Sequence, residues 1–271
     1  MDIQWYPGHM AKARRQIKEN LKLIDLVVEL TDARVPQSAR NPDIPEIHHK
    51  PYILAVTKTD LADPARTEVW RQFWQKNQEG AVLLDLASGK GVEKLRTEIT
   101  KSLPALRRPP RVLVVGIPNV GKSSLINRLT GRSGTKVGAK PGVTRGKQWI
   151  NAKGLQLLDT PGILWPKFED QETAKKLAAT AAIRDEVVNI EEVTYWLLNY
   201  LREHYPELLV KRYSLDLGIN NTLELFEQIG RQRGCLRAQG EIDYLQTAQA
   251  VLKDFRSGLI GPVTLELPEK E

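Results

Sequence analysis

Short apolar runs recur along the first 160 residues and alternate with segments of helical periodicity. The runs have the length of buried strands and cover residues 26–30, 52–56, 81–86, 112–115, 148–151 and 155–158. Apolar positions at helical spacing mark residues 64–76, 92–102 and 124–129. Strands that alternate with helices predict an α/β fold whose mostly parallel sheet carries helices on both faces.

The pattern changes between residues 165 and 175. Beyond this point the spacing predicts helices at residues 191–203, 223–230 and 242–255, and no repeated strand pattern follows. We therefore predict two domains, an α/β domain over residues 1–170 and a smaller all-helical domain over residues 171–271.

The composition is typical of a water-soluble globular protein, with 41% apolar and 27% charged residues among 271. The chain contains no apolar run long enough to span a membrane and no secretory signal, so we expect no stable membrane association. Its single cysteine, Cys235, excludes an internal disulfide and suits a cytoplasmic location.

Positive charge is concentrated in the predicted α/β domain. Residues 1–170 carry 28 basic and 17 acidic side chains, whereas the rest of the chain is net acidic. No acidic residue lies between Glu98 and Asp159, an interval that holds 12 basic ones. One bound nucleotide cannot neutralise so many positive charges. We therefore predict a second polyanionic partner, for which RNA is the natural candidate. A solvated basic surface is the alternative.

The strand at residues 112–115 leads into a phosphate-binding loop. The segment Gly116–Ser123 fits the pattern G-x-x-x-x-G-K-[ST] between a strand and a helix. Its glycines let backbone N–H groups turn toward a phosphate, and the helix N-terminus adds positive potential. We predict that Lys122 contacts the β- and γ-phosphates and that Ser123 binds Mg²⁺. The residues predicted to bind the phosphates are Asn119, Val120, Gly121, Lys122, Ser123 and Ser124.

Two further segments complete the predicted nucleotide site. The segment Asp159–Gly162 follows a strand, so Asp159 can hold a Mg²⁺-bound water while the Gly162 N–H faces the γ-phosphate. In the segment Thr57–Asp60, Asp60 can accept hydrogen bonds from guanine N1 and N2, and the stem of Lys58 can cover the ring. This predicts guanine, because adenine offers no such pair of donors.

Two details qualify the prediction for guanine. Asn is the usual residue where Thr57 stands, and Thr keeps one hydrogen-bonding group but loses the two-sided reach of an amide. Base selectivity is then expected to be looser than usual. Ala87 and Ser88 are expected to supply the backbone contact to guanine O6.

The predicted guanine elements precede the phosphate loop, the reverse of the order in ordinary GTPases. In this order the chain resembles the circularly permuted GTPases of ribosome assembly, and in particular the ribosome biogenesis GTPase A family. Further segments look like signatures of that family, and the resemblance covers nearly the whole chain. These segments are residues 5–13, 32–36, 141–145 and 254–258.

The resemblance implies a permuted GTPase domain followed by a helical RNA-binding domain. It also implies that the protein binds the large ribosomal subunit and its rRNA late in assembly and hydrolyses GTP there. We expect the protein to be a monomer. Thr144 matches the family's switch threonine, which completes the Mg²⁺ shell, and Asn119 matches an asparagine linked to a potassium ion. An asparagine that only caps the loop is the alternative for Asn119.

The resemblance also leads to an expectation about the rate of hydrolysis. Ile163 stands where many GTPases place a water-orienting glutamine, so we expect slow intrinsic turnover that ribosomal particles stimulate. Lys122 and Thr144 are the expected catalytic residues, and His9 is a candidate substitute for the glutamine because it titrates near neutral pH. A structural or RNA-contacting role is the alternative for His9.

The chain runs from Gly162 directly into the helical domain. A γ-phosphate that orders the Thr144 and Gly162 loops could therefore move that domain as a lever.

Two other functions agree less well with the sequence. A GTP-dependent RNA-modifying enzyme would need a second catalytic constellation, and the sequence shows none. A membrane-associated signalling GTPase lacks a C-terminal cysteine for prenylation, although the basic N-terminal helix could lie on an anionic surface.

Overall fold

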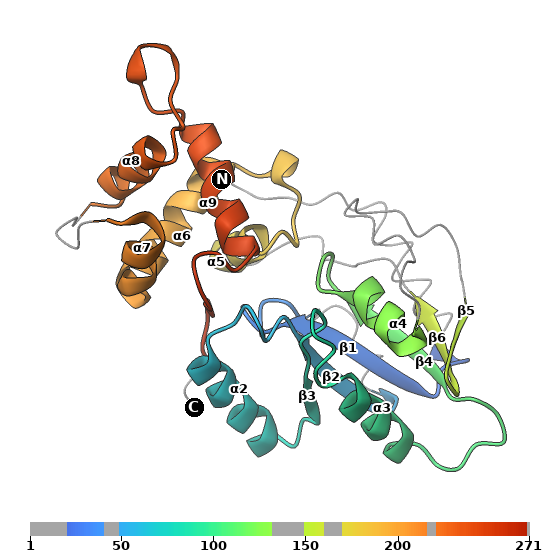
Figure 1. Ribbon diagram of the computed structural model, residues 1–271. Coiled ribbons are helices and arrows are strands. Elements are labelled where there is room, and N and C mark those ends of the chain that lie inside the picture. The colour runs from blue at the N-terminus through green and yellow to red at the C-terminus, as the bar shows by residue number, and fades with distance from the viewer. Residues whose placement is uncertain (1–20, 41–48, 132–148, 160–169, 216–220, 270–271) are drawn as a thin grey trace. The chain divides into compact units, whose positions relative to one another are not determined.

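The computed structural model describes residues 21–40, 49–131, 149–159, 170–215 and 221–269 (Figure 1). The chain forms two compact units. The α/β unit comprises residues 4–168 and 266–271, and the helical unit comprises residues 169–265 with residues 1–3. That each unit is an independent domain with the predicted limits stays a prediction.

The α/β unit is built on a six-stranded sheet in the order β3-β2-β1-β4-β6-β5. Every neighbouring pair is parallel except β5 and β6, so the predicted mostly parallel sheet is confirmed. The strands are β1 (Leu26–Asp32), β2 (Tyr52–Thr57), β3 (Ala81–Leu83), β4 (Arg111–Gly116), β5 (Trp149–Ala152) and β6 (Leu155–Asp159). The β3 strand is shorter than its apolar run, because Asp85 pairs with Lys90 instead of continuing the sheet.

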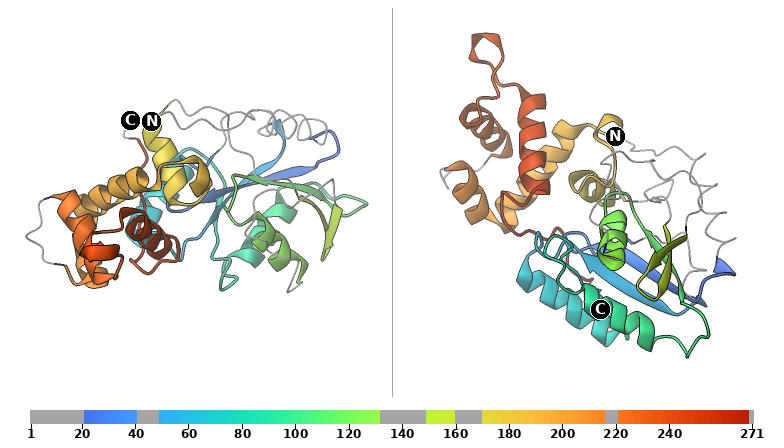
Figure 2. Two further views of the ribbon diagram at one scale, coloured as in Figure 1. Left: turned by 90° about the horizontal axis from the view of Figure 1, so that it is seen from above. Right: turned by 45° about the vertical axis from the view of Figure 1, so that its right-hand side comes forward.

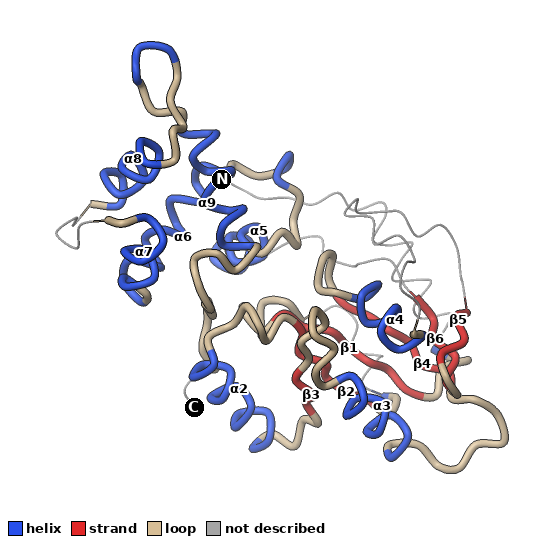
Figure 3. Tube along the Cα trace, in the orientation of Figure 1, coloured by secondary structure: helices blue, strands red, loops and turns tan. Residues whose placement is uncertain are grey.

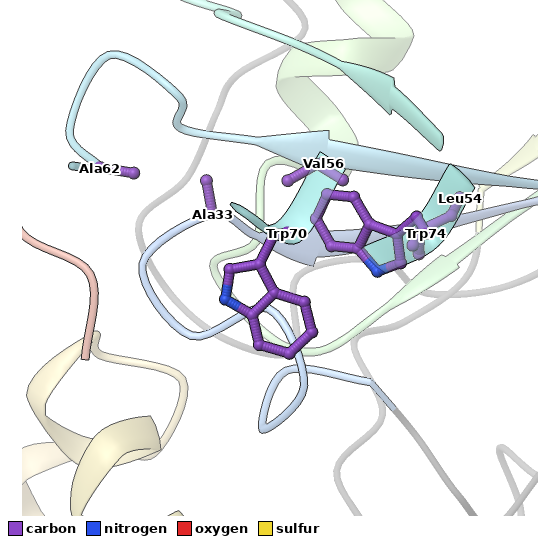
Figure 4. Packing of buried hydrophobic residues seen from close by; sticks show 6 residues of the cluster. All are labelled: Ala33, Leu54, Val56, Ala62, Trp70 and Trp74. Carbon is purple, nitrogen blue, oxygen red and sulfur yellow. The ribbon is translucent and has the colours of Figure 1, made fainter. Parts of the chain in front are cut away.

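Three described helices accompany the sheet. They are α2 (Pro64–Lys76), α3 (Val92–Lys101) and α4 (Lys122–Thr130), and α3 and α4 lie side by side (Figure 2). The α2 helix begins where the Asp63 carboxylate accepts two first-turn N–H groups. Trp70 and Trp74 of this helix are buried in one cluster with Leu54 and Val56 of β2 (Figure 4). Aromatic side chains of this size supply much of the apolar area that fixes α2 to the sheet.

Five α-helices make up the described part of the helical unit (Figure 3). They are α5 (Gln171–Ala179), α6 (Ile190–His204), α7 (Pro206–Tyr213), α8 (Thr222–Gln232) and α9 (Tyr244–Arg256), with short 3-10 turns at η2 (Asp185–Val187) and η3 (Ala238–Gly240). The α6 helix is central, because it contacts each of the other four. No helix among the described residues is long and apolar enough to cross a membrane.

The segment at residues 254–258 has a structural role at the end of α9. The buried carboxylate of Asp254 accepts hydrogen bonds from Arg212 at 2.9 Å and Arg233 at 3.3 Å. Arg256 donates to the carbonyls of Ala178 and Ala179, in the last turn of α5. The bonds from Arg256 add side-chain donors at the C-terminal end of α5, so the segment fixes α9 to its neighbours.

The chain returns to the α/β unit after the helical unit. The Thr264 carbonyl accepts hydrogen bonds from the hydroxyls of Tyr200 and Tyr205, within the helical unit. Two residues later, the Glu266 carboxylate accepts the Ser38 N–H at 2.9 Å, and the Glu266 carbonyl accepts the Trp70 indole N–H at 3.1 Å. The helical unit is therefore joined to the α/β unit at both of its ends.

Candidate nucleotide-binding site

The described segments of the predicted site lie at one edge of the sheet. The parallel strands β1, β2, β4 and β6 end there in Asp32, Thr57, Gly116 and Asp159. From β1 the chain continues to β2 on one side, and from β4 it continues to β5 and β6 on the other, so β1 and β4 flank a topological switch point. Ligands of open α/β sheets bind in the crevice outside such a point.

The phosphate loop connects β4 to α4 and depends on two glycines. Gly116 has φ 154° and Gly121 has φ 107°, conformations that side chains with a Cβ rarely adopt. A Cβ on Gly116 would lie 2.9 Å from the Leu30 carbonyl, so no larger residue fits. The Lys122 ammonium donates to the carbonyls of Gly116 at 3.0 Å and Ile117 at 2.7 Å. The lysine side chain thus folds back over the loop that is predicted to hold phosphates.

The first turn of α4 supplies further donors. Gly121 is the N-cap, so the N–H groups of Lys122, Ser123 and Ser124 lie in the first turn, at the N-terminus of the helix. Such N–H groups and the helix dipole favour an anion. In β6, the backbone of Asp159 pairs beside Val114 of β4, which places this residue at the same edge.

The donor set at this edge fits Mg²⁺ held together with a nucleotide. Among the described residues, no group of three or more His, Cys, Asp or Glu side chains could hold a metal ion alone. Mg²⁺ usually keeps several waters and takes few protein ligands beside phosphate oxygens. The Ser123 hydroxyl at the start of α4 is an oxygen donor of the type that such a site uses, and its binding of Mg²⁺ stays a prediction.

Asn119 has a conformational reason to be an asparagine. Its φ of 58° lies in the left-handed region, which Asn tolerates better than most residues. The loop geometry alone therefore accounts for this residue type, and the link to potassium stays a prediction.

Thr57 joins the guanine element to the phosphate loop. Its fully buried hydroxyl lies 2.7 Å from the Val120 carbonyl and 3.0 Å from the Thr31 carbonyl. A hydroxyl carries one hydrogen, so these two carbonyls share a single donor. The threonine thus links β1, β2 and the phosphate loop, although it lacks the amide that usually occupies this position.

Lys58 and Asp60 lie in the tight loop after β2, where Leu61 N–H donates to the Lys58 carbonyl. The Asp60 side chain is exposed at this edge. The Lys58 ammonium lies 2.9 Å from the carboxylate of Asp32, which also binds Arg34 at 2.8 Å. Burial opposes ionisation of Asp32, but these two cations outweigh it and lower its pKa.

Ala87 and Ser88 belong to a turn that Asp85 holds closed. Their N–H groups donate to the Asp85 carboxylate at 2.8 and 3.0 Å, and the Ser88 hydroxyl bonds to it as well. These bonds lower the pKa of Asp85, and the bond from the Ser88 hydroxyl contributes most. The contact of Ala87 and Ser88 with guanine stays a prediction. Within the described part of the chain, the neighbouring Leu86 N–H donates to no other group.

Arg128 is a site residue that the sequence did not indicate. It lies on α4, and its guanidinium donates to the carbonyls of Leu86 at 3.0 Å and Ala87. The helix that follows the phosphate loop therefore also holds the turn predicted to contact the base. An arginine near a helix C-terminus is common, so its spacing alone carried no signal.

Three predicted site residues lie outside the described residues. They are His9, Thr144 and Gly162, and Ile163 lies there too. The side chain of Asp159 is likewise not described.

Several arginines of the helical unit form ion pairs. Arg212 and Arg233 bind the buried Asp254, while Arg231 lies 3.6 Å from Glu227 and Arg237 lies 3.4 Å from Asp243. Arg212 and Arg233 thus have a structural role as well as a charge. RNA binding by this unit stays a prediction.

Comparison with known proteins identifies relatives whose descriptions agree with one another. A family model described as 50S ribosome-binding GTPase matches residues 111–213. The Ribosome biogenesis GTPase A of Bacillus cereus is 46% identical over 282 residues, covering 100% of this chain and 95% of that protein. The protein of the same description from Thermotoga maritima is 33% identical, covering 98% of this chain and 95% of its own.

Solved structures agree with the sequence comparison. The GNP-bound YlqF of T. maritima has a TM-score of 0.71 and 28% identity, and the match covers 96% of this chain and 100% of that one. A GDP-bound YlqF structure gives the same TM-score over 94% of this chain. Because relatives more than 30% identical cover 98–100% of its length, the chain belongs to the ribosome biogenesis GTPase A family.

Proposed function

We propose that the edge formed by β1, β2, β4 and β6 binds GTP with Mg²⁺ and that a precursor of the large ribosomal subunit is the partner. The chain is a GTPase of ribosome biogenesis. One observation carries the assignment of the site: the phosphate loop and the guanine element are bound to each other through the Thr57 hydroxyl and the Val120 carbonyl. A nucleotide that spans both elements then meets one connected surface.

Each part of the site has a separate task in this proposal. The first-turn N–H groups of α4 and the Lys122 ammonium neutralise the β- and γ-phosphates. Bound Mg²⁺, held by Ser123 with Asp159 and Thr144, would supply further charge neutralisation. Asp60 accepts the two guanine donors. The Leu86 N–H donates to no other group among the described residues, so it is a better candidate donor to O6 than Ala87 or Ser88.

The partner supplies what the chain lacks for fast hydrolysis. The Ile163 side chain cannot hydrogen-bond a water, so intrinsic turnover is slow and ribosomal particles stimulate it. Asn119 is proposed to bind a potassium ion that offsets transition-state charge, and His9 is proposed to orient the water. The basic α/β unit is proposed to contact rRNA, and the protein acts as a cytoplasmic monomer.

GTP turnover with purified large and small subunits, in potassium and then in sodium buffer, tests this function. Stimulation by large subunits supports the proposed partner, and an absence of stimulation while GTP still binds contradicts it. Lys122→Ala should remove turnover in every condition, which shows that the measured hydrolysis belongs to this site.

Asn119→Gly tests the potassium proposal, because glycine keeps the left-handed backbone and removes only the amide. Loss of the potassium effect with retained GTP binding supports the ion. An unchanged potassium effect leaves the asparagine as a loop residue.

A further inference from the structure

A buried charge cluster lies beside the guanine element, at the carboxyl end of β1. The Asp32 side chain is 3% exposed and lies between Arg34 and Lys58. Asp32 accepts three hydrogen bonds from Arg34: from the backbone N–H at 3.0 Å, from Nε at 3.0 Å and from Nη2 at 2.8 Å. The bidentate fork fixes the plane of the carboxylate, because a guanidinium presents its donors in a rigid geometry.

The fixed carboxylate in turn holds the Lys58 side chain. The Lys58 ammonium lies 2.9 Å from Asp32 Oδ2, the same oxygen that receives Arg34 Nη2. The backbone of Lys58 has φ 57°, a left-handed conformation that a lysine adopts at a cost. The ion pair at the end of the side chain and the turn at its base therefore fix both ends of the lysine stem.

A lysine stem covers a base only if it stays extended. A free lysine has four rotatable side-chain bonds, and burying it against a ligand costs much of that freedom. An anchor that holds the ammonium before the ligand arrives removes part of this cost, which is the general effect of preorganisation. The Asp32 carboxylate is such an anchor, because Arg34 already holds it in place.

We propose that Asp32, held by Arg34, is a positioning residue for guanine binding that acts through Lys58. The inference rests on the proposed function, in which the Lys58 stem covers the base. Asp32 touches no nucleotide atom in this proposal. Its loss should weaken GTP and GDP equally, because both share the base and differ only in the γ-phosphate.

A double-mutant cycle tests whether Asp32 acts through Lys58. Asp32→Asn removes the charge at nearly constant shape, and Lys58→Met keeps an unbranched stem without the ammonium. Titration with GTP and GDP should give roughly 10- to 100-fold weaker binding for Asp32→Asn, the range for losing a charge-assisted hydrogen bond. In the Lys58→Met background, Asp32→Asn should cause no further loss. An equal loss in both backgrounds would mean a merely structural role and overturn the proposal.

Asp25 provides a matched control at the other end of β1. It also forms a bidentate pair with an arginine, Arg108, at 2.7 and 2.9 Å. Asp25→Asn should leave both nucleotide affinities unchanged. A loss as large as that of Asp32→Asn would show that any broken pair on this strand has the same effect, which contradicts the proposal.

Arg34→Lys keeps the proposal testable if Asp32→Asn does not fold. Lysine keeps the charge but cannot form the bidentate fork, so binding should weaken in the parent chain and not in the Lys58→Met background. The proposed function has its own readout in this experiment. If the unmodified chain binds neither nucleotide, both ideas fail, whereas normal binding with additive losses refutes only the role of Asp32.

Discussion

Replacing Thr57 with valine tests the connection between the guanine element and the phosphate loop. Valine has nearly the shape of threonine, so the change removes the hydroxyl and leaves the packing almost unaltered. The hydroxyl is fully buried and serves the carbonyls of Val120 and Thr31. Both acceptors would lose their shared donor in a place that water does not reach.

The expected cost follows from the burial of this hydrogen bond. A typical hydrogen bond contributes about 1 kcal/mol net, but leaving a buried acceptor unsatisfied costs about 1–3 kcal/mol. We therefore expect Thr57→Val to lower the free energy of unfolding by roughly 2 kcal/mol. If about 1.4 kcal/mol of this energy holds the phosphate loop in its binding conformation, GTP binding weakens about tenfold.

Two measurements separate these effects, with serine as the control. Urea unfolding reports the stability of Thr57→Val, and nucleotide titration reports its affinity. Thr57→Ser keeps the hydroxyl and should bind GTP like the parent chain, with a small stability loss from the missing methyl group. If valine and serine gave the same affinity, the hydroxyl would not organise the phosphate loop and the reasoning would be refuted.

Three more outcomes are expected. Asp254→Ala should destabilise the helical unit by about 3 kcal/mol in urea unfolding, because two arginines lose a buried anion. A stability within about 1 kcal/mol of the parent chain would argue against this anchor. Arg128→Met should weaken GTP and GDP binding equally in titrations by freeing the turn at Leu86, while a selective loss of GTP would contradict that role. The folded-state pKa values of Asp25, Asp32 and Asp85 lie below the ordinary value, so their stabilising contribution is complete above about pH 4 and is lost as pH falls through those lower values. Urea unfolding between pH 6 and pH 2 should show this decline, and a flat profile would contradict it.

The strands and longer helices could be predicted because their apolar spacing is strong. The helix predicted at residues 64–76 has those limits in the structure, and the parallel sheet follows from the alternation of strands and helices. Two helices were missed. The α5 helix is only nine residues long and α7 only eight, too short for a clear helical period in the apolar positions.

The site was predictable where a motif fixes the backbone. The phosphate loop needs glycine at Gly116 and Gly121, and those positions could be read directly from the chain. The contacts of Asp32 with Lys58 and of Arg128 with Leu86 could not be read, because each joins segments distant in the sequence. A charged residue at the carboxyl end of a buried strand was the available signal for Asp32, since such residues in neighbouring parallel strands meet at one edge.

The sheet explains how the site tolerates a rearranged chain. Its parts lie at the carboxyl ends of β1, β2, β4 and β6, so their positions depend on the order of strands in space. The order of the strands along the chain determines where the helical unit is attached. It is inserted between β6 and the segment that begins at Glu266, and therefore has two junctions with the α/β unit.

These two junctions constrain the lever hypothesis. Thr264 is bound within the helical unit and Glu266 within the α/β unit, so only Leu265 lies between the two anchors. A movement started at the Gly162 end must then either pivot at Leu265 or break the bonds of Glu266. Glu266→Ala removes acceptors of Gln37 and Ser38 and should destabilise the α/β unit by roughly 2 kcal/mol.

Small-angle scattering of the GTP and GDP forms tests whether this second junction restrains a movement. With Glu266→Ala, the difference between the two forms should grow, because one of the two anchors is lost. The exposed Glu269, which lies three residues further along the chain, provides the control, and Glu269→Ala should change neither stability nor scattering. If the two nucleotide forms of the parent chain and of Glu266→Ala all scattered alike, the nucleotide would move no lever. A growing difference would instead show that the chain's return to the α/β unit limits how far the helical unit moves.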